Sequence, residues 1–144
     1  MARRLVALAL VLLVAACATT RPAPEEHEAA AKRHAPDPAR AGVYVYRDER
    51  FGADIPMEVM LDGAAVGRTL GHTFFFLELR PGEHRISSTH GRDAALELEM
   101  EAGQLYYLWQ EVTVDADGVR SQLHLVDPEV GREAVARCRM LDPW

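Results

Sequence analysis

Cysteine is scarce in this chain, which carries only Cys17 and Cys138. A disulfide framework is therefore not expected, and a domain of about a hundred residues can bury an ordinary hydrophobic core without one. The chain also lacks clusters of lysine and arginine, and its formal net charge is −6 at pH 7. Nucleic acid is therefore not an expected partner, because binding to phosphates depends on concentrated positive charge.

Residue sets typical of metal sites and enzymes are missing as well. The six histidines include no pair at the spacing of metal ligands, and His84 and His90, which share a strand face, lie too far apart at about 3.3 Å per residue. Ser87 and Ser88 lack the sharp turn of a nucleophile elbow, and glycine-rich phosphate loops are absent. We expect no catalytic residue, no metal and no cofactor, with a hydrolase as the less favoured alternative.

The N-terminus predicts export. Arg3 and Arg4 supply positive charge, and the run Leu5–Ala16 that follows them is entirely apolar. A membrane-spanning helix needs about 20 apolar residues, and this run is shorter and gives way to polar sequence. Residues 1–16 are therefore interpreted as a signal peptide.

The end of that run, Val14-Ala15-Ala16-Cys17, resembles the lipobox of bacterial lipoproteins. The resemblance implies cleavage between Ala16 and Cys17 and a lipid on the Cys17 thiol, which would hold the chain on a membrane. Cleavage would remove two arginines and change the formal charge from −6 to −8. No basic patch remains to bind anionic lipid, so attachment depends on the acyl chains. In such families an aspartate after the cysteine retains the protein at the inner membrane, so Ala18 favours the outer membrane, facing the periplasm.

Residues 17–41 are interpreted as the lipidated cysteine and a flexible tether. A segment without large apolar residues cannot supply a core. Its middle, Glu25 to Lys32, has a helix-forming composition and is expected to be helical only transiently. The segment is also interrupted by four prolines, at Pro22, Pro24, Pro36 and Pro38. The folded domain is predicted to span residues 42–141.

From residue 42 the pattern changes to short runs of β-branched and aromatic residues separated by Asp-Gly, Pro-Gly and Ala-Gly pairs. This pattern predicts an all-β domain. In residues 94–100 leucine and methionine alternate with glutamate, so that strand has one face in water. The predicted strands are Val43–Arg47, Met57–Leu61, Thr73–Leu79, His84–Thr89, Ala94–Met100, Leu105–Val114 and Val119–Val126.

Two of these strands are apolar on both faces, over residues 74–77 and 105–109. A further layer must therefore cover the second face. The last segment is the predicted cover, because Asp127 can cap a helix and Pro128 suits the first helical position. The helix would bury one stripe, made of Val130, Ala134, Cys138 and Leu141 with Val135 beside it.

The order of these elements resembles a known family. The matching motifs are Val43–Arg47, Leu61-Asp62-Gly63 with Val66-Gly67, Leu79–Ile86, Gly103–Tyr107 and a final helix from Glu133 to Leu141. They are similar to the bacterial lipoprotein family called domain of unknown function 2846, and the Asp-Gly and Pro-Gly elements are also similar to PEGA-like β-domains. The resemblance implies a small β-sandwich of about seven strands with a C-terminal amphipathic helix, on an exported lipoprotein. It implies no catalytic residues.

Aromatic residues make up 7% of the chain, and most fall on predicted strands. Exposed, they would form a stacking surface for a glycan or a peptide; buried, they would line the core or lie under the helix. The possible ligand-facing aromatics are Tyr44, Tyr46, Phe74, Phe76, Tyr107 and Trp109. The favoured function is a non-enzymatic lipoprotein of the cell envelope that binds or assembles with another envelope component. A glycan- or peptide-binding module is the alternative.

Overall fold

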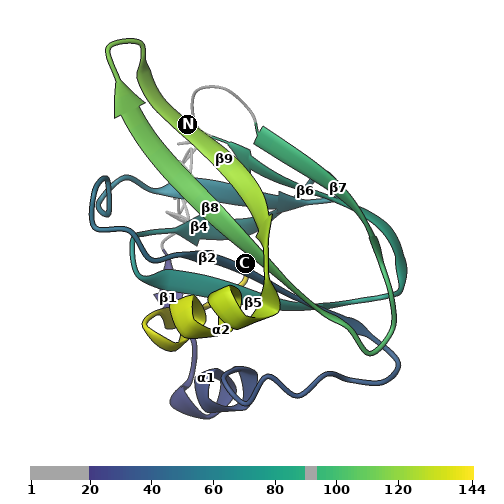
Figure 1. Ribbon diagram of the computed structural model, residues 1–144. Helices are drawn as coiled ribbons and strands as arrows, with labels where there is room; N and C mark the ends of the chain where they lie inside the picture. Colours follow the sequence, from purple (N-terminus) through teal and green to yellow (C-terminus); the bar gives the residue numbers. More distant parts are fainter. Residues whose placement is uncertain (1–19, 90–93) are drawn as a thin grey trace, which may run out of the picture.

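The computed structural model describes residues 20–89 and 94–144. These residues form mostly β-structure in two sheets, with two helices (Figure 1). In chain order the elements are β1 (Arg21–Pro22), α1 (Glu25–Ala31), β2 (Ala41–Arg47), β3 (Met57–Leu61), β4 (Ala64–Thr69), β5 (Thr73–Leu79), β6 (Gly82–Thr89), β7 (Ala94–Met100), β8 (Leu105–Asp115), β9 (Gly118–Val126), α2 (Pro128–Ala136) and β10 (Arg139–Asp142). Within these ranges, neither helix is long and apolar enough to cross a membrane.

The strands are divided between a six-stranded sheet and a four-stranded sheet. The larger sheet has the order β1-β10-β5-β2-β8-β9, and the smaller has the order β4-β3-β6-β7. β2 lies near the centre of the larger sheet, antiparallel to β5 and parallel to β8. Each of the seven predicted strands is present, with ends that differ by at most two residues.

Alternation along β2 separates two buried layers. Val43 and Val45 pack in the core that the two sheets share, while Tyr44 and Tyr46 belong to a second cluster on the opposite face. The shared core also takes Val59, Val66, Ile86 and Met100 from the smaller sheet and Phe75, Leu79, Leu108 and Leu123 from the larger one. The doubly apolar strands of the sequence are therefore strands of the six-stranded sheet that are buried on both faces.

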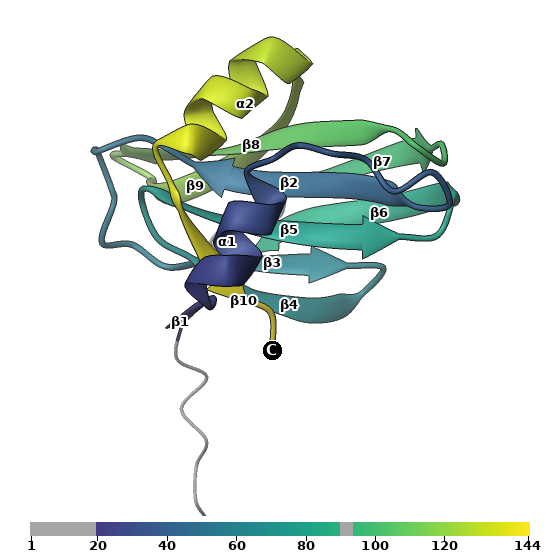
Figure 2. The ribbon, with the colours of Figure 1, turned by 90° about the horizontal axis from the view of Figure 1, so that it is seen from below.

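Both helices lie against the outer face of the six-stranded sheet, the face turned away from the smaller sheet (Figures 1 and 2). α2 begins as predicted, since the Asp127 carboxylate accepts a hydrogen bond from the Glu129 N–H at 3.0 Å. Gly131 faces the Tyr107 ring, and a Cβ at this position would lie 2.3 Å from Tyr107 Cγ. Glycine therefore lets α2 approach the sheet more closely than any other residue would.

The predicted C-terminal helix is too long. α2 ends at Ala136, and the chain continues as β10, which pairs in parallel with β5. The Arg139 N–H donates to the His72 carbonyl at 2.9 Å. The open edge of β5 supplies hydrogen-bond partners for the backbone of residues 139–142. These hydrogen bonds stabilise a strand there in spite of the helical periodicity of the sequence. Cys138 and Leu141 are buried as expected, but outside the helix.

Residues 20–40, which we call the N-terminal arm, are folded against the domain. The prediction of a flexible tether is therefore wrong for this part, and residues 17–19 lie outside the described ranges. β1 pairs with β10, and the small side chains of Ala23 and Ala31 are buried. Polar contacts replace the large apolar residues that the arm lacks. The Lys32 ammonium donates to the Cys138 carbonyl at 2.7 Å, and Lys32 is the sole lysine of the chain.

β4 has no counterpart among the predicted strands. Its sequence is rich in alanine and includes a glycine, a composition that does not indicate a strand. It follows β3 through a two-residue turn in which Asp62 and Gly63 have φ angles of 49° and 82°. Asp-Gly favours this type I′ hairpin, so the turn places β4 beside β3 in spite of its weak propensity.

Candidate functional site

The six aromatic residues predicted to face a ligand form two rows on the outer face of the six-stranded sheet. Each row crosses β5, β2 and β8, because alternate residues of a strand point to the same side. Cross-strand pairing aligns Phe76, Tyr44 and Tyr107 in one row and Phe74, Tyr46 and Trp109 in the other. The fold therefore brings all six residues together.

Most of this aromatic surface is closed. Tyr44, Tyr46, Phe74 and Tyr107 are each at most 3% exposed. The arm, α2 and β10 cover these four side chains, so none of them forms an open stacking surface. Phe76 and Trp109 are only partly buried, and each lines an opening in the cover.

Two tyrosine hydroxyls tie the arm to the sheet. The Tyr44 hydroxyl donates to the Ala31 carbonyl at 2.7 Å, and the Tyr107 hydroxyl lies 2.9 Å from His34 Nδ1. The two phenol rings stack with their centroids 4.7 Å apart. Burial raises the pKa of both hydroxyls, which therefore stay protonated at neutral pH. Both tyrosines hold the structure together and are not accessible acid–base groups.

An opening beside α2 is lined by Tyr46 and Trp109 of the second row, and we call it the α2 groove. Its volume is about 240 Å³. Val130 belongs to the predicted buried stripe, but it is 56% exposed and borders this groove. The groove is lined by Tyr46, Asp48, Trp109, Val126, Val130, Glu133, Ala134 and Arg137. An exposed valine beside a partly exposed tryptophan gives an apolar surface that no segment among the described residues covers.

Two ion pairs stand at the β2 end of the α2 groove. The Asp48 carboxylate is paired with the Arg137 guanidinium of α2. The Glu49 carboxylate is held at 2.8 Å by Arg47, which is fully buried. Trp109 Nε1 lies 3.5 Å from the second Glu49 oxygen, which orients the indole ring. Both guanidinium charges here are therefore engaged by carboxylates.

Two further carboxylates lack such an arginine. Glu133 lines the groove, and no ion pair of the described residues involves it. Glu111 lies 2.8 Å from His124 Nε2, and the His124 ring packs at 5.1 Å against the Trp109 ring. Glu111 is paired with His124 and does not line the groove. With Asp48 paired to Arg137 and Glu49 to Arg47, Glu133 leaves one more carboxylate than guanidinium groups beside the groove. The apolar surface therefore has an acidic rim.

A second opening, the α1 cleft, lies between the arm and the sheet. Its volume is about 350 Å³. The rings of Tyr44 and Phe76 form part of its lining and stack at 4.5 Å. His27, Arg33 and Glu78 add polar groups of both charge signs around it. Phe76 is the ligand-facing candidate that this cleft leaves accessible.

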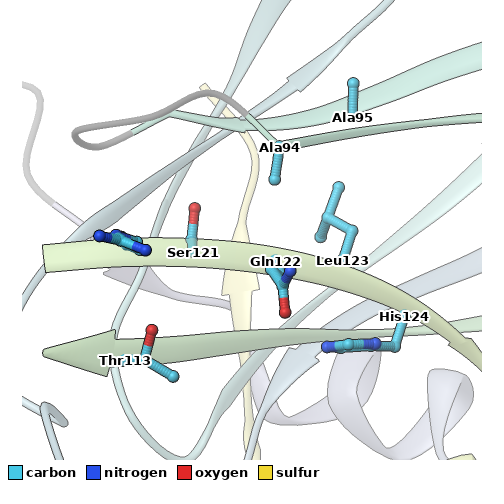
Figure 3. A pocket seen from close by; sticks show the side chains of 8 residues that line it. Ala94, Ala95, Thr113, Ser121, Gln122, Leu123 and His124 are labelled. Atoms are coloured by element: carbon cyan, nitrogen blue, oxygen red, sulfur yellow. The ribbon is translucent and has the colours of Figure 1, made fainter. Parts of the chain in front are cut away.

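A third opening, about 610 Å³, lies beside β9 where this strand faces β7 (Figure 3). Ala94 and Ala95 of β7 line one side, and Ser121 and Leu123 of β9 line the other. Apart from Leu123 its walls are small or polar, and it holds none of the six aromatic residues. It therefore offers less apolar surface to a ligand than its size indicates.

A buried chain of polar side chains leads from this cavity into the core. Ser121 Oγ accepts from Ser88 Oγ at 2.7 Å, Ser88 Oγ accepts from Gln110 Nε2 at 2.6 Å, and Gln110 Oε1 accepts from Thr69 Oγ1 at 2.5 Å. The chain connects β9, β6, β8 and β4, and so joins the two sheets. Each hydroxyl is engaged by a neutral partner, and within residues 20–89 and 94–144 neither a histidine nor a carboxylate is hydrogen-bonded to Ser88. The network is a structural link between the sheets.

His84 has hydrogen-bond partners on both ring nitrogens. His84 Nδ1 lies 2.7 Å from Asp62, and its Nε2 lies 2.8 Å from the Arg80 carbonyl. In residues 20–89 and 94–144, no three histidine, cysteine, aspartate or glutamate side chains are grouped as metal ligands. His90, Ala16 and Cys17 fall outside these ranges. Cys138 is buried, and burial raises the pKa of its thiol to about 12.

Comparison with known proteins agrees with the motifs of the β-domain. The profile of the family described as "Protein of unknown function (DUF2846)" matches residues 37–120. The chain belongs to this family. An uncharacterised protein of Haemophilus influenzae is 27% identical over 135 residues, which cover 92% of this chain and 80% of the relative. The family match covers β2 to β8 and ends within β9, so it includes the aromatic rows but neither helix.

Sequence reasoning identified Tyr46 and Trp109 but missed the side of the groove that α2 supplies. A usable signal was present, because Val130, Glu133 and Arg137 are spaced by three and four residues and so share one helix face. The acidic rim had no such signal. Its carboxylates come from the loop after β2 and from α2, and only the fold places them together.

Proposed function

We propose that the protein is a lipid-anchored lipoprotein of the bacterial cell envelope, held on the membrane by a lipid on Cys17. The sequence Val14-Ala15-Ala16-Cys17 supports this proposal. We further propose that residues 20–144 form a β-sandwich domain without enzymatic activity, placed on the outer membrane and facing the periplasm. Two stacked sheets with a shared core support the sandwich.

The domain acts as a binding module for a polypeptide of the envelope. The α2 groove carries this part of the proposal, because Val130 and Trp109 offer an apolar surface in a chain that otherwise buries its aromatic rows. Contiguous exposed apolar surface is typical of interaction sites. A mixed surface of one aromatic ring and aliphatic groups suits the side chains of a peptide better than the flat face of a sugar.

A glycan-binding module is the second candidate, and the α1 cleft is the observation that favours it. Its stacked Tyr44 and Phe76 rings and the nearby polar groups His27, Arg33 and Glu78 are the elements of a small ligand site. Its volume of about 350 Å³ lies at the lower end of the range for such sites.

The anchor is tested by mass spectrometry of the protein extracted from membranes. We expect a mature chain that begins at Cys17 and carries acyl groups. The Cys17→Ala variant should remain unprocessed or be released, because the chain has no basic patch to hold it on the bilayer. An unmodified Cys17 peptide in the membrane-extracted protein would contradict the proposal.

The binding site is tested by photo-crosslinking in intact cells. A photoreactive amino acid replaces Val130 in one variant and Val114 in a matched control. Val114 is also a valine and is 42% exposed, but it lies near the tip of the β8–β9 hairpin and outside the α2 groove. We expect a discrete crosslinked polypeptide from position 130 and none from position 114. Equal crosslinking from the two positions would contradict the assignment of the site.

A further inference from the structure

We propose that the α2 groove binds a cationic segment of a partner polypeptide, with an apolar side chain of that segment in the groove and its lysine or arginine residues against the acidic rim. This inference rests on the proposed function and adds the chemical class of the partner. Three properties of the groove support it: its size, its apolar lining and the balance of charge around it.

The size of the groove fits a side chain. Small-molecule sites in proteins are typically about 300–1,000 Å³, whereas the α2 groove has a volume of about 240 Å³. Such a space accommodates one or two apolar side chains of a longer partner that continues over the surface on either side. A polypeptide is therefore a better occupant than an entire small molecule.

The lining provides the apolar contact. Val130 comes from α2, Val126 from β9 and Trp109 from β8, so the surface is built on regular elements. Regular elements hold their side chains in place before binding, which reduces the entropy lost when a partner docks. Aromatic residues at the centre of such a surface contribute much of the binding energy in interfaces.

The charge around the groove selects the sign of the partner. Asp48 is neutralised by Arg137, and Glu49 by the buried Arg47. Glu133 is in no ion pair of the described residues, which gives a local excess of one negative charge at the groove. The whole chain adds to this field with its net charge of −6. A cationic segment is attracted locally and at long range, whereas an acidic segment is repelled.

Tryptophan fluorescence offers a direct test on the folded protein. The chain has two tryptophans, Trp109 and Trp144. Trp144 does not line the groove, and the Trp144→Phe variant leaves Trp109 as the only indole. The probe is a synthetic peptide of alternating leucine and lysine, and the matched peptide carries glutamate in place of lysine. We expect the lysine peptide to change Trp109 emission with a saturable curve that weakens as salt is added, and the glutamate peptide to leave it unchanged.

Matched variants locate the binding energy. Glu133→Gln should weaken binding of the lysine peptide by about two- to fivefold, as expected for loss of one exposed charge contact. Glu129→Gln is the control, since Glu129 lies on the same helix but does not line the groove. Val130→Ser should weaken binding of the peptide, and the surface change Val114→Ser should not. Each variant is first checked for an unchanged melting temperature.

The results separate this inference from the proposed function. If position 130 crosslinks to a polypeptide but the lysine and glutamate peptides bind Trp144→Phe equally, the groove is a binding site and the charge assignment is wrong. If the lysine peptide binds without changing Trp109 emission, it binds elsewhere and the inference is overturned. If neither crosslinking nor binding occurs, both proposals fail.

Discussion

The two faces of the six-stranded sheet are buried in different ways. The inner face is closed by a second sheet, and its side chains, such as Val45 and Leu108, need only close packing. The outer face carries aromatic rings and is closed by segments from both ends of the chain. Here the tyrosine hydroxyls need partners, and they find them in the arm at Ala31 and His34.

This difference indicates which layer opens first. The inner core holds large aliphatic side chains from both sheets, whereas the arm contributes only small buried side chains, Ala23 and Ala31. Polar contacts such as the hydrogen bond from Lys32 to Cys138 hold the arm, and such bonds contribute about 0.5–1.5 kcal/mol each. The arm is therefore expected to detach at a lower cost than either sheet. The helices also leave parts of the face uncovered, at the α2 groove and at the α1 cleft.

Removal of residues 128–144 should have the largest effect. The deletion takes away α2 and β10 and leaves Tyr46 and Tyr107 without cover. We expect loss of the cooperative unfolding transition, or aggregation, measured by circular dichroism and light scattering. The control removes only residues 143–144, which should cost little. A monomeric truncated protein with an unchanged melting temperature would show that the outer layer is not part of the stable fold.

Adjacent phenylalanines allow the two faces to be compared directly. Phe74 faces the outer layer and Phe75 the inner core, and both are at most 1% exposed. Phe74→Ala and Phe75→Ala should each lower the free energy of unfolding by about 3–5 kcal/mol, measured in denaturant. Phe76→Ala, at the partly exposed α1 cleft, should cost clearly less. If Phe74→Ala costs no more than Phe76→Ala, the outer cluster is not a true core.

The hydroxyl of Tyr44 tests the attachment of the arm. Tyr44→Phe removes one of two hydrogen bonds to the Ala31 carbonyl, which still accepts from the His34 N–H, and should lower the free energy of unfolding by about 0.5–1.5 kcal/mol. Amide hydrogen exchange should become faster in the arm and not in β2. Tyr46→Phe is the control, because the Tyr46 hydroxyl makes no hydrogen bond with any described residue. Equal effects of the two variants would exclude a specific role for the Tyr44 hydroxyl.

The smallest expected effect is a change in the attachment of the arm with pH, caused by protonation of His34. Burial, Arg132 and Lys32 lower the pKa of His34 from its ordinary value of 6.5. The detached arm therefore binds a proton more readily than the docked arm, and attachment weakens as the pH falls below about 6.5. An NMR titration should give a His34 midpoint below 6.5, with faster arm exchange at the acid end. His34→Gln should remove this pH dependence.

His84 provides the contrast on the surface of the smaller sheet. The hydrogen bond that His84 Nδ1 donates to the Asp62 carboxylate raises the pKa of His84 above its ordinary value. Its stabilising effect is therefore complete below about pH 6.5 and is lost as the pH rises through the raised pKa, opposite in sign to that of His34. A His84 midpoint below that of His34 would contradict the assigned environments.

Local patterns in the sequence determined most of the β-structure. The β-branched and aromatic runs of β2 and β5, the alternation in β7 and the Asp127-Pro128 start of α2 are properties of neighbouring residues, so they are readable without knowledge of the fold. The double-sided apolar pattern of Phe74–Leu77 also indicated that a further layer must exist. It did not indicate which segments form that layer.

Only the tertiary structure decided how the outer face is covered and what remains open. The arm has the composition of a linker, yet it folds because its partners are supplied by residues as distant as Cys138, 106 positions from Lys32. β10 also depends on a distant partner, because it forms on the free edge of β5. The α2 groove does as well, since its apolar lining and acidic rim come from separate elements. These features depend on contacts between distant residues, and a local pattern carries no information about such contacts.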